Sequence, residues 1–425
     1  MVPGCGNQGR AINPSSRLSA EWLYTGAGEV IPFGALLTDS HGRILAAGPD
    51  HRVPTSPYIK SEHFSAAAII PGLVNAHTHL ELTGLEGQVN DSEFAEWIGT
   101  LVRLKYRWAP LDFLQAARKG LHQSFEAGVT TVADTGDSGA PFEVLLEQGG
   151  SGIAYLEVFG PDPALADAQF DAFRARVQEL KPRQTERVRL GVSPHAPYSV
   201  SGPLYSRVAR FAEEERLPMA VHIAESAAES ALMEQADGPF ARLWQRREIP
   251  LPSLPGRTPL AWLDEHGVLG SRTLCIHVVR AEPDDITRLA RHQCAVAHCP
   301  RSNRRHGHGD APLKQLLAAG LHVGVGTDSA ASVHPVDLLA EARVAQALGG
   351  LSADQALGLV MLGAARALDL DLELGSLALG KWADCAVINL PRGTRVPAIP
   401  DAILASRPND VVATFVAGRE VHRRS

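Results

Sequence analysis

Two patterns of hydrophobic and polar residues divide this chain. From about residue 18 to 65, short alternating segments surround a turn signal at 39–42, and a similar pattern returns at 383–421. Alternation of this kind is typical of half-buried β-strands, and the turn signal predicts a β-hairpin. Neither end supplies enough strands for a stable sheet of its own. We therefore expect 17–67 and 375–425 to form one small β-domain.

The chain between these ends, 68–374, repeats a strand followed by a helix. An apolar run at 68–74 predicts the first buried strand. Seven more strands are predicted at 129–134, 153–159, 188–193, 219–224, 273–278, 295–298 and 322–327. Helices are expected at 112–127, 163–180, 203–216, 283–292, 311–319 and 336–349. Eight strands over about 300 residues favour an α/β fold of the (β/α)8 barrel type over an open sheet.

Composition and charge narrow the class of protein. A chain of 425 residues with 45 % hydrophobic and 20 % charged residues has the make-up of a soluble globular protein. Its net charge of −7, without a long basic run, argues against nucleic acid or a membrane as a partner. Five cysteines without a C-x-x-C pair favour reduced thiols and a cytoplasmic protein. Residues 1–16 lack the apolar core of a signal peptide and are predicted to be a disordered leader.

Histidines and carboxylates recur where the predicted barrel strands end. His77 and His79 follow the first strand, and residues two apart on a strand point to the same face. Parallel barrel strands deliver their C-terminal residues to the face where barrel enzymes keep their chemistry. Later strands end at His195, His222, His277 and Asp328. Ionisable residues at the same end of five predicted strands favour a functional site over a set of unrelated core histidines.

Four of these side chains have the chemistry of a metal site. We expect His77, His79, His222 and Asp328 to form one cluster of three imidazoles and one carboxylate. Such a set suits Zn²⁺ or Fe²⁺ with room for a water, whose pKa the ion lowers towards about 7. Glu225, just beyond the fifth-strand ligand, is placed to carry protons between water, substrate and leaving group. His277 is placed to hydrogen-bond the hydroxide or to stabilise developing charge.

These residues resemble the amidohydrolase superfamily and, within it, the cytosine-deaminase-like aminohydrolases. The resemblance covers nearly the whole chain. It rests on five motifs: PGLVNAHTH at 71–79, SPHAPYS at 193–199, HIAE at 222–225, HCPRSN at 298–303 and GTDS at 326–329. It implies a metal on the four residues named above, Glu225 as the proton shuttle, His277 beside the hydroxide, and Asp328 taking a proton from the water. It also implies that the terminal strands form a small β-sandwich.

The number of metal ions follows from the fourth strand. Relatives with two metals use a bridging carboxylated lysine at the end of that strand. Here the strand, 188–194, contains no lysine and is followed by His195. We therefore predict one divalent ion per chain, with Zn²⁺ as the expected ion and Fe²⁺ as the alternative.

The substrate is suggested by a narrower resemblance, to aminodeoxyfutalosine deaminases, which act on an adenine bearing a modified ribose. Glu81 would accept hydrogen bonds from ribose hydroxyls, and His195 would contact the purine. Trp97 lies in a segment that either contacts substrate or simply packs as a helix. Asn303 is counted with the substrate-binding residues. The segment 301–310 is more basic and richer in histidine than in relatives, so it is either a solvated loop or a place where Arg304 receives an anionic group.

Three functions remain open from the sequence. The first is hydrolytic deamination of an aminopurine nucleoside or a related aminated heterocycle, with release of ammonia. The second is ring opening or chlorohydrolysis of another heterocycle on the same scaffold, because fold alone does not separate these reactions. The third is a catalytically silent barrel that binds a metal or ligand. The expected partner is a small molecule, and a homodimer is compatible with the sequence.

Overall fold

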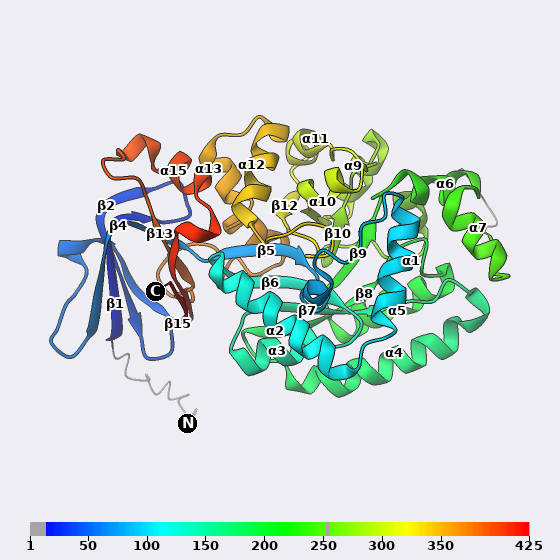
Figure 1. The fold of residues 1–425 in the computed structure, drawn as a ribbon, viewed down its shortest axis with the longest axis horizontal. Coiled ribbons are helices and arrows are strands. Elements are labelled where there is room, and N and C mark those ends of the chain that lie inside the picture. The colour runs from blue at the N-terminus through cyan, green and yellow to red at the C-terminus, as the bar shows by residue number, and fades with distance from the viewer. Residues whose placement is uncertain (1–13, 252–255, 425) are drawn as a thin grey trace, which may run out of the picture.

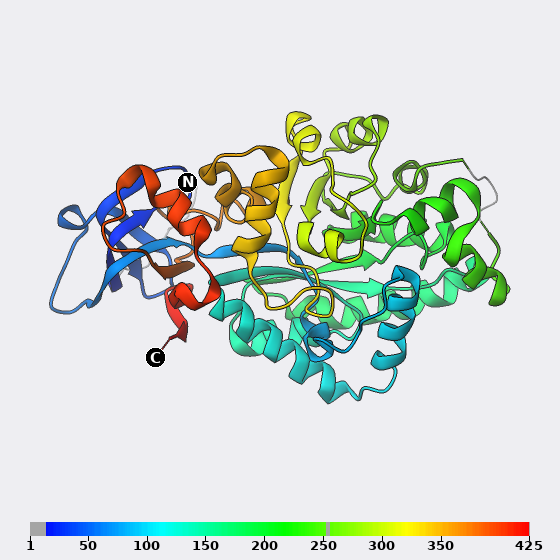
Figure 2. The same ribbon diagram turned by 45° about the horizontal axis from the view of Figure 1, so that its top comes forward.

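The computed structural model describes residues 14–251 and 256–424, and within them two sheets lie side by side (Figure 1). A small sheet built from both ends of the chain lies at the left, and a barrel of parallel strands with helices around it lies at the right; Figure 2 shows the same arrangement after rotation. The predicted fold class, an α/β barrel with a small β-domain from both termini, is confirmed. The predicted leader falls outside the described residues except for 14–16, which already belong to a strand.

The small sheet has the strand order β15-β14-β13-β4-β1-β2-β3. Its strands are β1 (Pro14–Tyr24), β2 (Val30–Asp39), β3 (Ile44–Pro49), β4 (Lys60–Pro71), β13 (Cys385–Asn389), β14 (Val411–Val416) and β15 (Arg419–Arg423). β1 and β4 run parallel, and β2 and β3 form the predicted antiparallel hairpin. Leu18, Ile69 and Val387 share one apolar cluster. The two termini therefore complete each other's core.

The barrel strands are neighbours in chain order from β5 to β12. They are β5 (Leu73–Thr78), β6 (Val129–Gly136), β7 (Gly152–Val158), β8 (Val188–Pro194), β9 (Met219–Ile223), β10 (Thr273–His277), β11 (Ala295–His298) and β12 (His322–Val325). The last strand meets the first where Thr327 and Asp328 donate backbone hydrogen bonds to the His77 carbonyl at 3.0 and 3.1 Å. A Cβ at Gly326 would lie 2.6 Å from the His77 backbone, so this closure requires glycine.

The first predicted strand is in fact divided between the two sheets. Its residues up to Pro71 end β4 of the small sheet, and Leu73 begins β5 of the barrel. Gly72 lies at the crossing, where a Cβ would collide with the side chain of Thr130. Both halves are buried, so a continuous apolar run gives no sign of the crossing. The prediction of one strand over 68–74 was therefore wrong.

Helices connect and cover the barrel strands. The longer ones are α1 (Phe94–Lys105), α2 (Pro110–Glu126), α4 (Ala166–Leu180), α5 (Gly202–Glu215) and α12 (Leu338–Gly349). The shorter ones are α3 (Ala140–Gln148), α6 (Ala227–Gln235), α7 (Gly238–Arg246), α8 (Pro259–Glu265), α9 (Pro283–Arg291), α10 (Pro300–Arg305), α11 (Leu313–Ala318), α13 (Ala353–Gly358), α14 (Leu362–Ala367) and α15 (Ile399–Ala405). In the part of the chain that the structure describes, no helix has the length and apolar character needed to cross a bilayer.

Candidate active site

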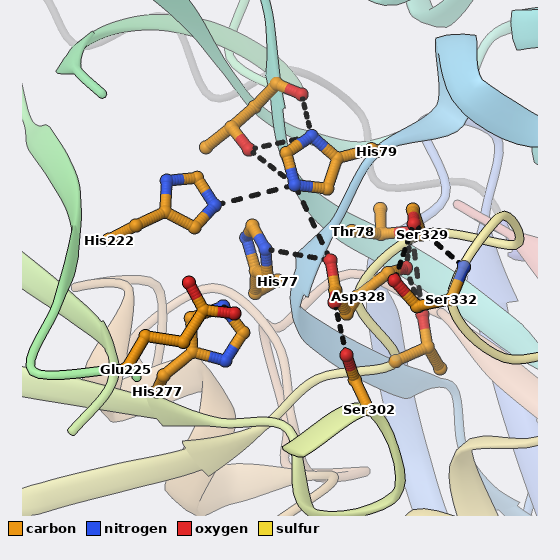
Figure 3. A network of polar contacts seen from close by, with 12 residues as sticks. His77, Thr78, His79, His222, Glu225, His277, Ser302, Asp328, Ser329 and Ser332 are labelled. Carbon is orange, nitrogen blue, oxygen red and sulfur yellow. Dashed lines mark hydrogen bonds and ion pairs between the residues drawn. The ribbon is translucent and has the colours of Figure 1, made fainter. Parts of the chain in front are cut away.

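Four side chains meet at the C-terminal ends of the barrel strands: His77, His79, His222 and Asp328 (Figure 3). Asp328 Oδ1 lies 3.6 Å from Nε2 of His77 and 3.4 Å from Nε2 of His79. The Nε2 atoms of His79 and His222 are 3.4 Å apart. The structure thus brings the four residues predicted as metal ligands into one cluster.

Backbone carbonyls orient two of these imidazoles. Nδ1 of His79 lies 2.8 Å from the carbonyl oxygen of Thr135, and Nδ1 of His222 lies 3.3 Å from that of His195. We assign the ring proton to Nδ1 in both, which leaves the Nε2 lone pair free. Within the described residues, neither ring nitrogen of the fully buried His77 has a hydrogen-bond partner. A buried nitrogen without a partner is costly, and a cation would remove that cost.

Burial and local charge set the protonation of the cluster. Burial lowers the pKa of His77 and His222, and it lowers that of His79 to about 3, so the rings are neutral at pH 7. Burial acts to raise the pKa of Asp328, but His77 and His79 outweigh it and hold that pKa well below its usual range. The hydroxyl of Ser302 donates to the second carboxylate oxygen of Asp328. Three neutral imidazoles and one carboxylate fit a divalent cation.

Glu225 and His277 face each other beside this cluster (Figure 3). Glu225 Oε1 is 3.5 Å from Nε2 of His277, and both side chains are buried. Nδ1 of His277 donates to Oδ1 of Asn303 at 2.9 Å. Asn303 is fully buried and does not line the pocket, and its contact with substrate stays a prediction. Its position orients His277.

The loop that carries Glu225 is fixed by Glu229, which the sequence patterns did not single out. The Glu229 carboxylate accepts hydrogen bonds from the backbone N–H groups of Ala224 and Glu225 at 2.9 and 2.8 Å. Ser226 caps α6 by accepting from the N–H of Glu229. Serine followed three residues later by glutamate is a helix-start signal, so the sequence did contain a clue to this residue.

A pocket opens beside the cluster, with one wall formed by α1. Phe94, Trp97 and Leu101 of that helix line it, together with Tyr198 and His195 from the chain after β8. Trp97 and His195 therefore both line this pocket, beside the histidine–carboxylate cluster. Nδ1 of His195 is 2.7 Å from the hydroxyl of Ser199, which orients the ring.

Two other predicted substrate contacts lie elsewhere. Glu81 is 1 % exposed and outside the pocket wall, and its carboxylate accepts from Lys105 Nζ at 2.8 Å and from the hydroxyl of Ser138. Arg304 is exposed and pairs with Asp310 at 2.7 Å. Both charged side chains are paired in the structure, through partners that no sequence pattern revealed, and their contacts with substrate stay predictions.

The sequence patterns did not single out two residues that line the pocket, Lys105 and Glu157. Burial raises the pKa of Glu157 well above its usual range, and its Oε1 has no hydrogen-bond partner among the described residues. Glu157 lies one residue before the end of β7, so the strand-end argument used for the histidines would have found it. Lys105 is the last residue of α1, where the sequence carries no comparable signal.

Comparison with known proteins adds relatives to this geometry. The model of the amidohydrolase family matches residues 68–421. An aminodeoxyfutalosine deaminase from Deinococcus radiodurans is 33 % identical over 346 residues, which covers 78 % of this chain and 80 % of that protein. A 5-methylthioadenosine/S-adenosylhomocysteine deaminase from Symbiobacterium thermophilum is 29 % identical over 416 residues, covering 94 % of this chain and 91 % of that protein.

Solved structures agree with the fold. A zinc-bound adenosine deaminase from Xanthomonas campestris has a TM-score of 0.83 at 25 % identity, covering 96 % of this chain and 92 % of that one. An aminofutalosine deaminase from Helicobacter pylori in complex with methylthio-coformycin has a TM-score of 0.84 at 22 % identity, covering 96 % and 100 %. The zinc-bound neighbour and the histidine–carboxylate cluster together support a divalent metal. By the match over residues 68–421, this chain belongs to the amidohydrolase family.

Proposed function

We propose that this chain is a metal-dependent deaminase that hydrolyses the 6-amino group of an adenosine-like nucleoside, with an aminodeoxyfutalosine-like substrate as the first candidate. The observation that carries the proposal is Glu225. This carboxylate is outside the predicted ligand set, lies within 3.5 Å of His277, and lines the same pocket as the cluster. The relatives from Deinococcus radiodurans and Symbiobacterium thermophilum, named as an aminodeoxyfutalosine deaminase and a 5-methylthioadenosine/S-adenosylhomocysteine deaminase, support the substrate class.

One divalent ion, Zn²⁺ first and Fe²⁺ as the alternative, is proposed at the four-residue cluster. A second group, formed by Glu157, His195 and His222, has ligand atoms within 4.8 Å of one another. It shares His222 with the first cluster, and burial favours the protonated form of Glu157, which is a poor ligand. The absence of lysine from β8 supports the same count. Elemental analysis of active protein should give one equivalent, and two tightly held ions would refute this count.

In the proposed reaction, water adds to C6 of the purine, a ring nitrogen gains a proton, and the C–N bond breaks as ammonia leaves. When bound, the cation supplies the Lewis acidity that makes water nucleophilic near neutral pH. Glu225 accepts one proton of the water and passes it to the ring nitrogen; the second proton, taken up by Asp328 as the added oxygen becomes a carbonyl, is relayed through Glu225 to the leaving amine. His277, held by Asn303, stabilises the attacking oxygen. We assign Asp328 a second role as acceptor of a water proton.

We further infer a cytoplasmic enzyme acting on a free small molecule. The four described cysteines, Cys275, Cys294, Cys299 and Cys385, are buried and form no disulfide, as in reduced proteins. The net charge of −7 agrees with a partner other than nucleic acid or an anionic membrane. The homodimer stays a prediction.

The test is an ammonia assay on purified protein reconstituted with Zn²⁺, Fe²⁺ or Mn²⁺. The substrates are aminodeoxyfutalosine, 5′-methylthioadenosine, S-adenosylhomocysteine, adenosine and a panel of aminopterins. We expect stoichiometric ammonia with retention of the purine ring and a preference for one of the nucleosides. Ring opening, or release of chloride from a chlorinated heterocycle without ammonia from any nucleoside, would replace the proposal by the alternative reactions.

A further inference from the structure

The histidine-rich segment after α10 turns two imidazoles inward while its arginines face solvent. His306 is half-buried and His308 is buried, whereas Arg304 and Arg305 are exposed. Gly307 adopts a φ of +69°, which glycine tolerates, and the two imidazoles end up 5.5 Å apart with an angle of 23° between their planes. The segment is therefore part solvated loop and part inner wall of the site.

Aromatic side chains of α1 hold these imidazoles. Phe94 meets the ring of His308 edge to face at 4.6 Å, and Trp97 meets that of His306 at 4.6 Å. The backbone N–H of His308 donates to the carbonyl of Asn303 at 2.9 Å, which fixes the segment to the end of α10. His308 is thus placed by both its backbone and its ring.

His308 reaches the same oxygen of Glu225 that His277 reaches. Its Nε2 lies 3.4 Å from Glu225 Oε1, and that of His277 lies 3.5 Å away. Among the described residues, the buried Nε2 of His308 has no hydrogen-bond partner, and Glu225 Oε1 is the acidic oxygen within 4 Å of it. Because Nδ1–H of His277 is bound to Asn303, His277 can donate a proton from Nε2 only as an imidazolium. A neutral His308 with its proton on Nε2 can donate at once.

We propose that His308 is a positioning residue for the proposed deamination, donating from Nε2 to Oε1 of Glu225 and holding this carboxylate in the orientation from which it moves protons. The proposal rests on the proposed function and extends it to a residue outside the five motifs. The charges around Glu225 are consistent with this role. Burial acts to raise its pKa, but His277 and His308 outweigh burial and the nearby Asp328 and lower it to about 2. Glu225 therefore enters the reaction as a carboxylate.

The experiment separates a hydrogen-bonding role from plain packing. His308→Phe keeps a ring against Phe94 but removes the donor, and His308→Gln keeps a donor without the ring. We expect His308→Phe to lower kcat by about 10- to 100-fold, the usual cost of losing a partner that orients a catalytic group, with KM within about threefold. The acid limb of its kcat/KM profile should move to higher pH, since Glu225 loses a contact that lowers its pKa. His308→Gln should recover part of kcat. His322→Phe, at the exposed start of β12, is the control and should match wild type.

The results for these variants distinguish a hydrogen-bonding role of His308 from packing alone. A wild-type kcat and an unmoved acid limb in His308→Phe, or equal losses in His308→Phe and His308→Gln, would reduce His308 to packing and overturn the proposal. Loss of metal from His308→Phe would do the same, because it would show a disturbed cluster. A second readout is independent of turnover: an infrared titration of the Glu225 carboxyl, assigned with Glu225→Gln, should move to higher pH in His308→Phe. If wild type deaminates none of the nucleosides, the proposed function fails while this titration still tests the contact.

Discussion

His77-Thr78-His79 and His306-Gly307-His308 share one spacing but stand on different backbones. The first pair ends a buried strand, and its rings are 4.8 Å apart with their planes at 83°. Both rings reach the same oxygen of Asp328. The second pair follows a short helix through a glycine in the left-handed region, and its rings lie nearly parallel at 5.5 Å. Of this pair, His308 reaches Glu225.

The difference shows how backbone and carboxylate partner, rather than spacing, decide what a histidine pair does. A strand aims both rings at one point, where three imidazoles and one carboxylate leave lone pairs for a cation. A left-handed turn lays the rings against an aromatic wall, where one imidazole is left to hold a carboxylate. The first pair therefore suits metal binding, and the second suits orientation of the proton shuttle and contact with substrate.

Removing one ring from each pair tests whether the two pairs differ in metal binding. His79→Ala should lose its metal and lower turnover by more than about 10⁴-fold, because the cation supplies several kcal/mol of transition-state stabilisation. His306→Ala should keep a full equivalent of metal. Mass-spectrometric metal analysis after desalting, together with the ammonia assay, measures both. Metal loss from the second variant would erase the distinction between the pairs.

Glu225→Gln tests the carboxylate that the second pair serves. One residue performs both proton transfers in the proposed reaction, so we expect turnover to fall towards the upper end of about 10²–10⁴-fold. Metal content should stay at the wild-type level, because Glu225 is outside the ligand cluster. The matched comparison is His222→Ala, which should lose metal and activity together. Turnover above a tenth of wild type in Glu225→Gln would show that another residue transfers the protons.

A smaller effect is expected from the pocket wall. His306 lines the pocket beside Trp97, and its Nε2 contacts the hydroxyl of Ser332 at 3.1 Å. Removing a ring that contacts a bound base costs about 1.4 kcal/mol, so His306→Ala should raise KM about tenfold. Its kcat should stay within about threefold of wild type. Steady-state kinetics separates the two, and a fall in kcat with unchanged KM would place His306 with the shuttle instead.

The first pair could be predicted from the sequence, whereas the second could not be placed. Strand periodicity and chain order bring His77, His79 and Asp328 to one barrel end, because parallel strands leave little freedom there. His308 depends on a turn through Gly307 and on the docking of α1, which are tertiary features. For the same reason the ion pair of Glu81 with Lys105 could not be predicted, because no pattern revealed that the end of α1 would return to Glu81.

The smallest expected effect concerns the pH dependence of stability. It comes from His298, which ends β11 and precedes α10 and the second histidine pair. It is fully buried, and burial lowers its pKa to about 3. The unfolded chain binds a proton here below about pH 6.5 while the folded chain excludes it, so stability falls as pH falls from about 6.5 towards 3. Between pH 7 and 5 this one group costs about 2 kcal/mol, or about 2 °C of Tm for a chain of this size.

Replacing His298 with Asn should remove that pH dependence. We expect the fall in Tm between pH 7 and 5 to be about 2 °C smaller in metal-saturated His298→Asn than in wild type, whatever the Tm at pH 7. Scanning calorimetry at both pH values measures it. His322→Asn, at an exposed position, should show the wild-type fall. A wild-type fall in His298→Asn would mean that His298 takes up a proton in the folded protein, and that the interior beneath the second pair admits charge.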